Sequence, residues 1–146
     1  MIPELKDATG GRNQTIAPFV ISSREDFTEG VNRIWPIGRL TLHEGTHGMD
    51  MVIRQRQDPA FHFIVADAYK QAMEKKIYQY IGQDGKVVPL YAASSRDEMI
   101  AEAVTRYHNL PQLDGANNYA RAGLRSRADL LAKDPTTFRI IETYLT

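Results

Sequence analysis

Residues 42–50 read LHEGTHGMD and contain the pattern HExxH, at His43, Glu44 and His47. The segment lies inside a longer stretch, from 37 to about 57, whose apolar and histidine positions recur at steps of three and four. This periodicity predicts an α-helix. Four residues advance a helix by about 400°, so the two imidazoles project from one face, one turn apart.

Two histidine nitrogens on one helix face can hold a single zinc ion at about 2.0–2.1 Å. Glu44 follows the first of these histidines and can reach a zinc-bound water, from which it would take a proton as general base. A pattern with three fixed letters also arises by chance, and the alternative is a solvated helix with two incidental histidines. The pattern therefore indicates a metal centre only if a third ligand exists.

A catalytic zinc site has three protein ligands and one open position. The chain has no cysteine, so the third ligand must be His, Asp or Glu. The candidates are His62, His108, Asp97, Glu98 and Glu102. Glu98 and Glu102 are four residues apart and share a helix face whose neighbours are apolar or small, which favours a site. Alternatively, Glu98 only completes a capping box that begins at Ser95.

The motifs resemble those of the anthrax lethal factor peptidase family, which also includes the Pro-Pro endopeptidases. Residues 42–50 are similar to its zinc-binding helix, and Asp50 matches an Asp three residues after the second His. The run EMIAEA at 98–103 is similar to its E-x-x-A-E-A helix, which implies that Glu98 is the third zinc ligand. Tyr91 lies seven residues before Glu98, as in the family, and is implied to stabilise the oxyanion.

The resemblance covers residues 37 to 146 with gaps between the motifs, and Gly45-Thr46 departs from the family's usual bulkier residue followed by Gly. Asp50 is expected to orient a zinc-binding His by a hydrogen bond, the alternative being a surface aspartate. Glu102 is expected to lie behind the ligands or in an ion pair. Without the resemblance, Tyr91 is an edge-strand aromatic.

The predicted fold is α+β and helix-rich, of the zincin type, with a small sheet and an HExxH helix. We expect one domain over residues 1–146, with an irregular lead-in at 1–14. The hydrophobic pattern and the start and stop signals predict the following elements. They are a strand at 15–22, helices at 23–34, 37–57 and 60–81, a turn at 83–85, an extended segment at 86–92, and helices at 95–108, 115–132 and 134–144.

Composition excludes several classes of function. The 18 basic and 18 acidic residues cancel, which argues against non-specific binding of nucleic acid or an anionic membrane. The lack of cysteine excludes disulfide scaffolds and thiolate zinc sites. No apolar run is long enough to insert across a membrane, and residues 1–15 have no signal-peptide core.

The resemblance implies a zinc-dependent endopeptidase that needs Zn²⁺ and acts on a protein or peptide substrate. By family analogy it would be a bacterial toxin or effector, secreted or delivered to a target cell. One alternative is a catalytically inactive zincin-like module for binding or translocation. Another is a helical partner-binding domain with a chance HExxH, which predicts that Glu98 and Tyr91 lie far from His43. The oligomeric state stays open.

Overall fold

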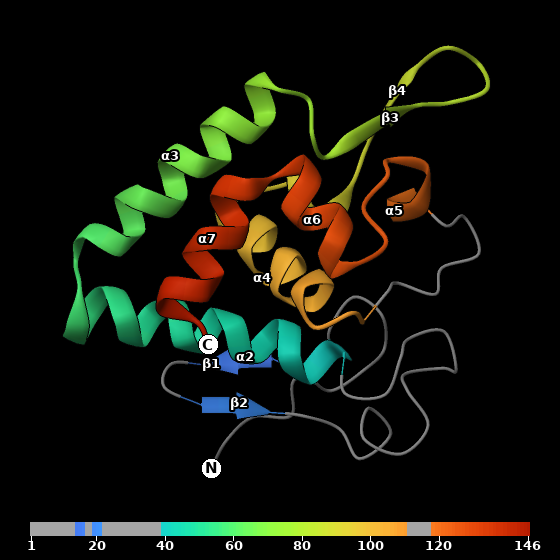
Figure 1. Ribbon diagram of the computed structural model, residues 1–146. Coiled ribbons are helices and arrows are strands. Elements are labelled where there is room, and N and C mark those ends of the chain that lie inside the picture. Colours follow the sequence, from blue (N-terminus) through green and yellow to red (C-terminus); the bar gives the residue numbers. More distant parts are fainter. Residues whose placement is uncertain (1–13, 17–18, 22–38, 111–117) are drawn as a thin grey trace.

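A computed structural model describes residues 14–16, 19–21, 39–110 and 118–146 (Figure 1). Its centre is helix α4, Arg96–Tyr107, and four other helices pack against it. These are α2 (Arg39–Val52), α3 (Ala60–Glu74), α6 (Arg127–Lys133) and α7 (Pro135–Tyr144). Two separate two-stranded sheets complete the described part. The expectation of a helix-rich α+β fold is confirmed.

Helix α4 begins at a serine cap, as the sequence predicts. The Ser95 hydroxyl accepts a hydrogen bond from the Glu98 backbone N–H at 3.1 Å. Every residue from 99 to 107 is buried, so the helix has no solvent-facing side beyond its first turn. It ends where Asn109 takes a left-handed conformation, with φ of 56°. The predicted helix at 95–108 is confirmed.

Helix α2 lies between α4 and a hairpin formed by strands β1 (Gln14–Ile16) and β2 (Phe19–Ile21). It continues into a π-helical turn, η2 (Ile53–Gln57), closed by a bond from the Asp58 N–H to the Ile53 carbonyl. The predicted helix at 37–57 is confirmed for its described part, with a π-helical last turn. The single strand predicted at 15–22 is wrong, because β1 and β2 are separate antiparallel strands.

Helix α3 ends at Glu74, and the prediction that it reaches residue 81 is wrong. Lys76 adopts a left-handed φ of 57°. The Lys76 N–H then bonds the Met73 carbonyl, and the Ile77 N–H bonds the Ala72 carbonyl. These two bonds form a Schellman motif, which turns the chain out of the helix.

The chain then forms a hairpin of β3 (Gln79–Ile81) and β4 (Val87–Pro89). Gly85, with φ of 76°, lies in the connecting turn predicted at 83–85. Pro89 pairs with Gln79 at the open end of this two-stranded sheet, where its missing N–H costs no ladder bond. The hairpin leads into a 3-10 turn, η3 (Tyr91–Ala93), which contacts α4. The extended segment predicted at 86–92 therefore stops at residue 89.

The helix predicted at 115–132 is wrong. The structure has a short helix α5 (Asn118–Arg121) and then α6. Gly123 ends α5 with φ of 73°, and the Leu124 N–H bonds the Tyr119 carbonyl in a second Schellman closure. Helix α6 starts afresh at a capping box between Ser126 and Asp129.

The final helix, α7, is confirmed with its predicted start. The Asp134 carboxylate caps it by accepting the Thr137 N–H at 3.1 Å, and Pro135 occupies its first position. The Tyr78 hydroxyl donates to the same buried carboxylate at 2.7 Å, which ties the segment after α3 to the start of α7. Phe138 and Ile141 bring α7 into the core.

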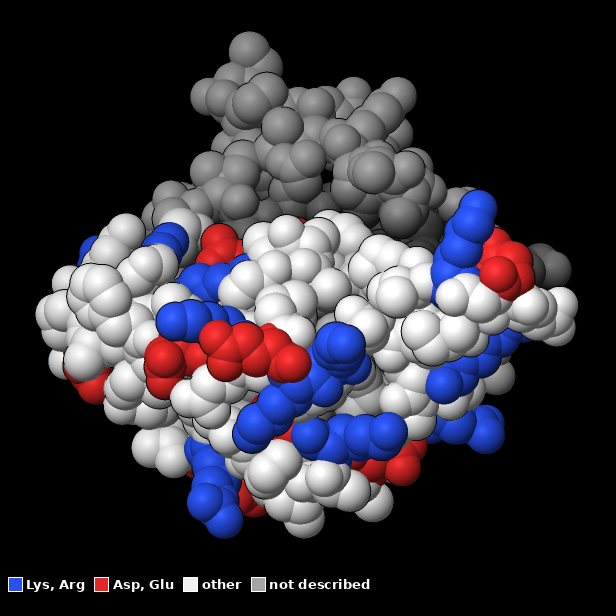
Figure 2. Space-filling view, turned by 90° about the horizontal axis from the view of Figure 1, so that it is seen from above, with Lys and Arg blue, Asp and Glu red and all other residues white. Residues whose placement is uncertain are grey.

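None of the helices in the described ranges is long and apolar enough to cross a membrane. On the face drawn in Figure 2, basic and acidic side chains of the described residues lie beside one another rather than in areas of one sign. The helix predicted at 23–34 and the lead-in at 1–13 lie outside the described residues; Gln14, the last residue expected in the lead-in, belongs to β1.

The end of α3 yields a stability prediction. A left-handed conformation costs an L-residue about 1 kcal/mol more than it costs glycine, so Lys76→Gly should raise the free energy of unfolding by about 0.5–1 kcal/mol. Lys75→Gly is the matched control, because Lys75 is right-handed with φ of −81° and gains nothing from glycine. Urea denaturation measures both. If Lys76→Gly lost as much stability as Lys75→Gly, the left-handed backbone at Lys76 would not be costing the fold free energy.

Candidate metal centre

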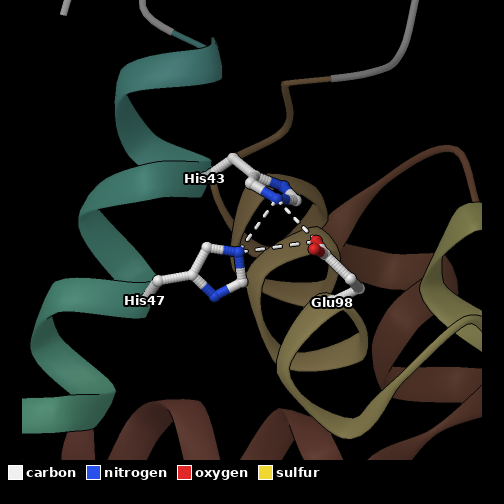
Figure 3. A group of neighbouring side chains, drawn as sticks. All are labelled: His43, His47 and Glu98. Atoms are coloured by element: carbon white, nitrogen blue, oxygen red, sulfur yellow. Dashed lines mark hydrogen bonds and ion pairs between the residues drawn. The ribbon is translucent and has the colours of Figure 1, made fainter. Parts of the chain in front are cut away.

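Three side chains from two helices converge on one point (Figure 3). The Nε2 atoms of His43 and His47, both on α2, are 3.2 Å apart. Glu98, in the first turn of α4, places Oε2 2.8 Å from the first nitrogen and 3.4 Å from the second. The HExxH spacing therefore puts both imidazoles on the face of α2 that meets α4.

The arrangement fits a zinc ion. Two ligand atoms bound tetrahedrally at about 2.0–2.1 Å lie about 3.4 Å apart. Two of the separations here, 3.2 and 3.4 Å, are close to that value, and the third, 2.8 Å, is shorter. Glu98 Oε2 is buried and, within the described residues, has no partner in hydrogen-bond geometry despite its two close nitrogens. A metal ion at this point would supply the partner that Glu98 Oε2 lacks. Two imidazoles and a carboxylate are a ligand set that zinc accepts.

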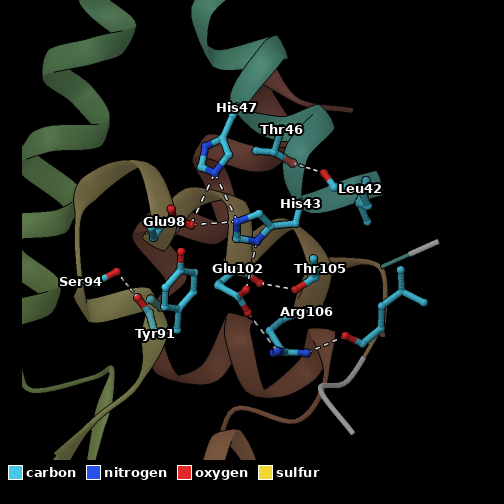
Figure 4. A network of polar contacts seen from close by, with 12 residues as sticks. Leu42, His43, Thr46, His47, Tyr91, Ser94, Glu98, Glu102, Thr105 and Arg106 are labelled. Atoms are coloured by element: carbon cyan, nitrogen blue, oxygen red, sulfur yellow. Dashed lines mark hydrogen bonds and ion pairs between the residues drawn. The ribbon is translucent and has the colours of Figure 1, made fainter. Parts of the chain in front are cut away.

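The imidazole of His43 is held from behind by a chain of buried charges (Figure 4). Its Nδ1 lies 3.0 Å from Glu102 Oε1, and Glu102 Oε2 lies 3.3 Å from the Arg106 guanidinium. Arg106 in turn donates to the Leu110 carbonyl at 2.6 Å and stacks on the Tyr119 ring. A carboxylate beside Nδ1 favours a proton on that nitrogen, which would leave Nε2 for a metal. Glu102 therefore lies behind His43 and in an ion pair with Arg106.

Proton affinities at the centre follow from these contacts. Burial lowers the pKa of His43, but the close carboxylates of Glu102 and Glu98 outweigh burial and raise that pKa to about 9. Burial acts to raise the pKa of Glu98, yet the contacts with His43 and His47 hold that pKa well below its usual range. When no metal is bound, these contacts thus favour a proton on His43 and a negative charge on Glu98.

Asp50 has a different partner from the one that the sequence suggests. Its carboxylate is 2% exposed and accepts two bonds from the Arg96 guanidinium, one of them at 2.9 Å, instead of orienting a zinc-binding His. Arg96 also pairs with Asp97 and donates to the carbonyl of His62 on α3. Because Arg96 is the first residue of α4, this contact locks α4 to α2 two residues before Glu98.

Glu44 and Tyr91 lie at the open side of the centre. Glu44 lines a cleft together with His47 and Glu98. Tyr91, in η3, is 54% exposed and directs its hydroxyl toward Glu98 (Figure 4). Burial of its inner edge and the charge of Glu98 raise the pKa of Tyr91 to about 12, so the hydroxyl keeps its proton at neutral pH. The edge-strand position considered for Tyr91 is not the observed one.

The other candidates from the sequence do not join the cluster. His62 is on α3 with its ring against Phe63, and His108 caps the end of α4 beside Tyr107. Asp97 turns to Arg96. Ser95 caps the Glu98 backbone while the Glu98 side chain faces the histidines, so capping and metal binding use different atoms of one residue.

Sequence reasoning missed the two arginines of the site. The Glu102–Arg106 pair carries a signal, since oppositely charged residues four apart meet on a helix. The Asp50–Arg96 pair joins residues 46 positions apart, and no local pattern announces it. Comparison of the chain with protein-family models, curated proteins and solved structures finds no match.

The buried chain behind His43 predicts the effect of Glu102→Gln. An amide cannot supply the same negative charge to His43 Nδ1, so zinc affinity should fall about 10- to 100-fold. Competition against a chromophoric chelator measures the affinity. The variant also leaves Arg106 buried without its carboxylate, which lowers stability.

The double variant Glu102→Gln/Arg106→Gln separates these two effects. Removing both charges restores stability, because no uncompensated buried charge remains, but zinc affinity stays low. Recovery of zinc affinity in the double variant would show that Glu102 acts on the metal centre only through fold stability.

Asp50 and Asp97 both pair with Arg96, and their different burial predicts different contributions to stability. Asp50→Asn breaks a buried pair and should cost about 3 kcal/mol of unfolding free energy. Asp97→Asn is the control; its side chain is 52% exposed, and its loss should cost less than about 1 kcal/mol. Urea denaturation with a chelator present keeps metal binding out of the comparison. Equal losses of unfolding free energy in the two variants would contradict the larger contribution expected of the buried Asp50–Arg96 pair.

Proposed function

We propose that the protein is a zinc-dependent endopeptidase of the zincin type. The observation that carries the proposal is the convergence of His43, His47 and Glu98 from two helices, with ligand atoms 2.8–3.4 Å apart. A chance HExxH on a partner-binding helix predicts a distant Glu98, and that separation is not found. The motif resemblance to the lethal factor family supports the same proposal.

The residues around the centre suit peptide-bond hydrolysis. Zinc, when bound by three protein ligands, acts as a Lewis acid toward water and a carbonyl group. Glu44 accepts the proton of the attacking water and passes it to the leaving amine. The Tyr91 hydroxyl donates a hydrogen bond to the carbonyl oxygen as negative charge develops on it. Glu102 and Arg106 hold His43 in place throughout.

By the same family resemblance, we place the substrate among proteins and peptides, and the biological role with a bacterial toxin or effector that is secreted or delivered to a target cell. This step rests on the analogy between motifs.

Metal content tests the site first. The chain, purified without chelator and offered zinc, should bind about one zinc ion per molecule, as a single three-ligand site requires. His47→Ala and Glu98→Ala should lose it, since two ligands do not hold zinc tightly. His62→Ala is the control, because His62 lies on α3 outside the cluster and should leave zinc content unchanged. Mass spectrometry of the native protein measures all four, and a wild-type chain without zinc overturns the proposal.

Peptide hydrolysis tests the reaction. Glu44→Gln should keep its zinc and lose about 10²–10⁴ in the cleavage rate of a peptide library. Tyr91→Phe should keep its zinc and lower kcat by about 10²–10³ with little change in KM. Removal of zinc by a chelator should abolish cleavage, and restored zinc should recover it. A zinc-loaded chain that cleaves no peptide would instead favour the inactive binding or translocation module.

A further inference from the structure

We propose that Arg54 binds a carboxylate of the substrate and so selects peptides with an acidic group near the cleaved bond. The inference rests on the proposed peptidase function. It starts from a cleft of about 350 Å³ that runs from Glu44, His47 and Glu98 to Arg54. Clefts of about 300–1,000 Å³ are the usual size for ligand sites. Arg54 thus shares one continuous hollow with the reacting centre.

The position of Arg54 along α2 and η2 sets the distance to the reaction. It follows His47 by seven residues, close to two helical turns, so it returns to the same face about 10 Å further along the axis. Side chains on a helix lean toward its N-terminus, which brings the guanidinium back toward the centre. An extended peptide covers about 3.3 Å per residue. The bound carboxylate therefore belongs two or three residues from the bond that is cut.

Charges in the cleft leave Arg54 available for a ligand. Two of the carboxylates in the cleft lining, Asp50 and Asp97, both pair with Arg96. Among the described residues, the Arg54 side chain has no ion pair or hydrogen bond, although it is half-buried. A half-buried guanidinium that lacks a partner gains most from an anion that arrives with a ligand.

The chemistry of the guanidinium indicates which kind of ligand it binds. Its planar fork matches a carboxylate with two parallel hydrogen bonds. Met51, one turn before Arg54, adds an apolar wall for the methylene groups of a glutamate or aspartate side chain. The carboxylate could belong to an acidic side chain or to the end of the peptide chain, and the two sources differ in a measurable way.

The test uses the zinc-loaded full chain and four peptide pools. The pools carry Glu or Gln at the second and third residues on either side of a randomised centre, each with a free or an amidated C-terminus. We expect kcat/KM for the Glu pools to exceed that for the Gln pools by about tenfold, the size of one charge-assisted contact. Preference for a free C-terminus alone would assign the contact to the chain end instead.

Two variants connect this preference to Arg54. Arg54→Gln should bring the Glu-to-Gln ratio to about one, and Arg54→Glu should lower it below one, because the two carboxylates repel each other. Arg56→Gln is the matched control, since Arg56 is exposed and lies outside the cleft lining, and it should keep the wild-type ratio. An unchanged Glu-to-Gln ratio in Arg54→Gln, or equal cleavage of all pools by the wild type, overturns the inference about Arg54. Neither result contradicts the proposed peptidase function.

If the wild type cleaves no pool, the peptidase proposal fails and the inference is decided by binding. Equilibrium binding of the same pools to the wild type and to Arg54→Gln then gives the answer. An Arg54-dependent preference for Glu supports the carboxylate site, and equal binding overturns it.

Discussion

The burial of Glu102 and Arg106 inside α4 is the constraint around which the described structure is arranged. A helix enclosed on nearly all sides cannot expose its charges, and an unpaired charge in such a place costs several kcal/mol. Glu102 therefore needs partners from its own helix and from α2, and it finds them in Arg106 and His43. The close approach of α2 to α4, and with it the meeting of His43, His47 and Glu98, follows from satisfying this pair.

Much of the fold was predictable from hydrophobic periodicity and from helix-capping residues. The helix of the HExxH segment, α4 with its serine cap and α7 with its Asp134–Pro135 start were predictable because each depends on neighbours within four residues. The three-residue cluster was predictable for a different reason: the spacing of two histidines and the similarity of the 98–103 run to a known helix pointed to the same chemistry.

What the sequence did not reveal has identifiable causes. Helix α3 stops because Lys76 takes a conformation that usually belongs to glycine, so no residue type marked the end. Gly123 lies inside the stretch that the sequence predicts as one helix, 115–132, whereas in the structure it closes α5. The partner of Asp50 lies on another helix, and a bond between residues far apart in the chain leaves no local pattern.

The donor atoms of the cluster come from two helices that are separate in the chain, so they come together only when the chain is folded. A cation that needs all of them acts as a removable cross-link between α2 and α4. Its binding free energy adds to the stability of the fold, about 4.1 kcal/mol at a thousandfold excess over the dissociation constant. The midpoint temperature of unfolding, measured against metal concentration, would thus rank candidate cations by affinity before any substrate is known.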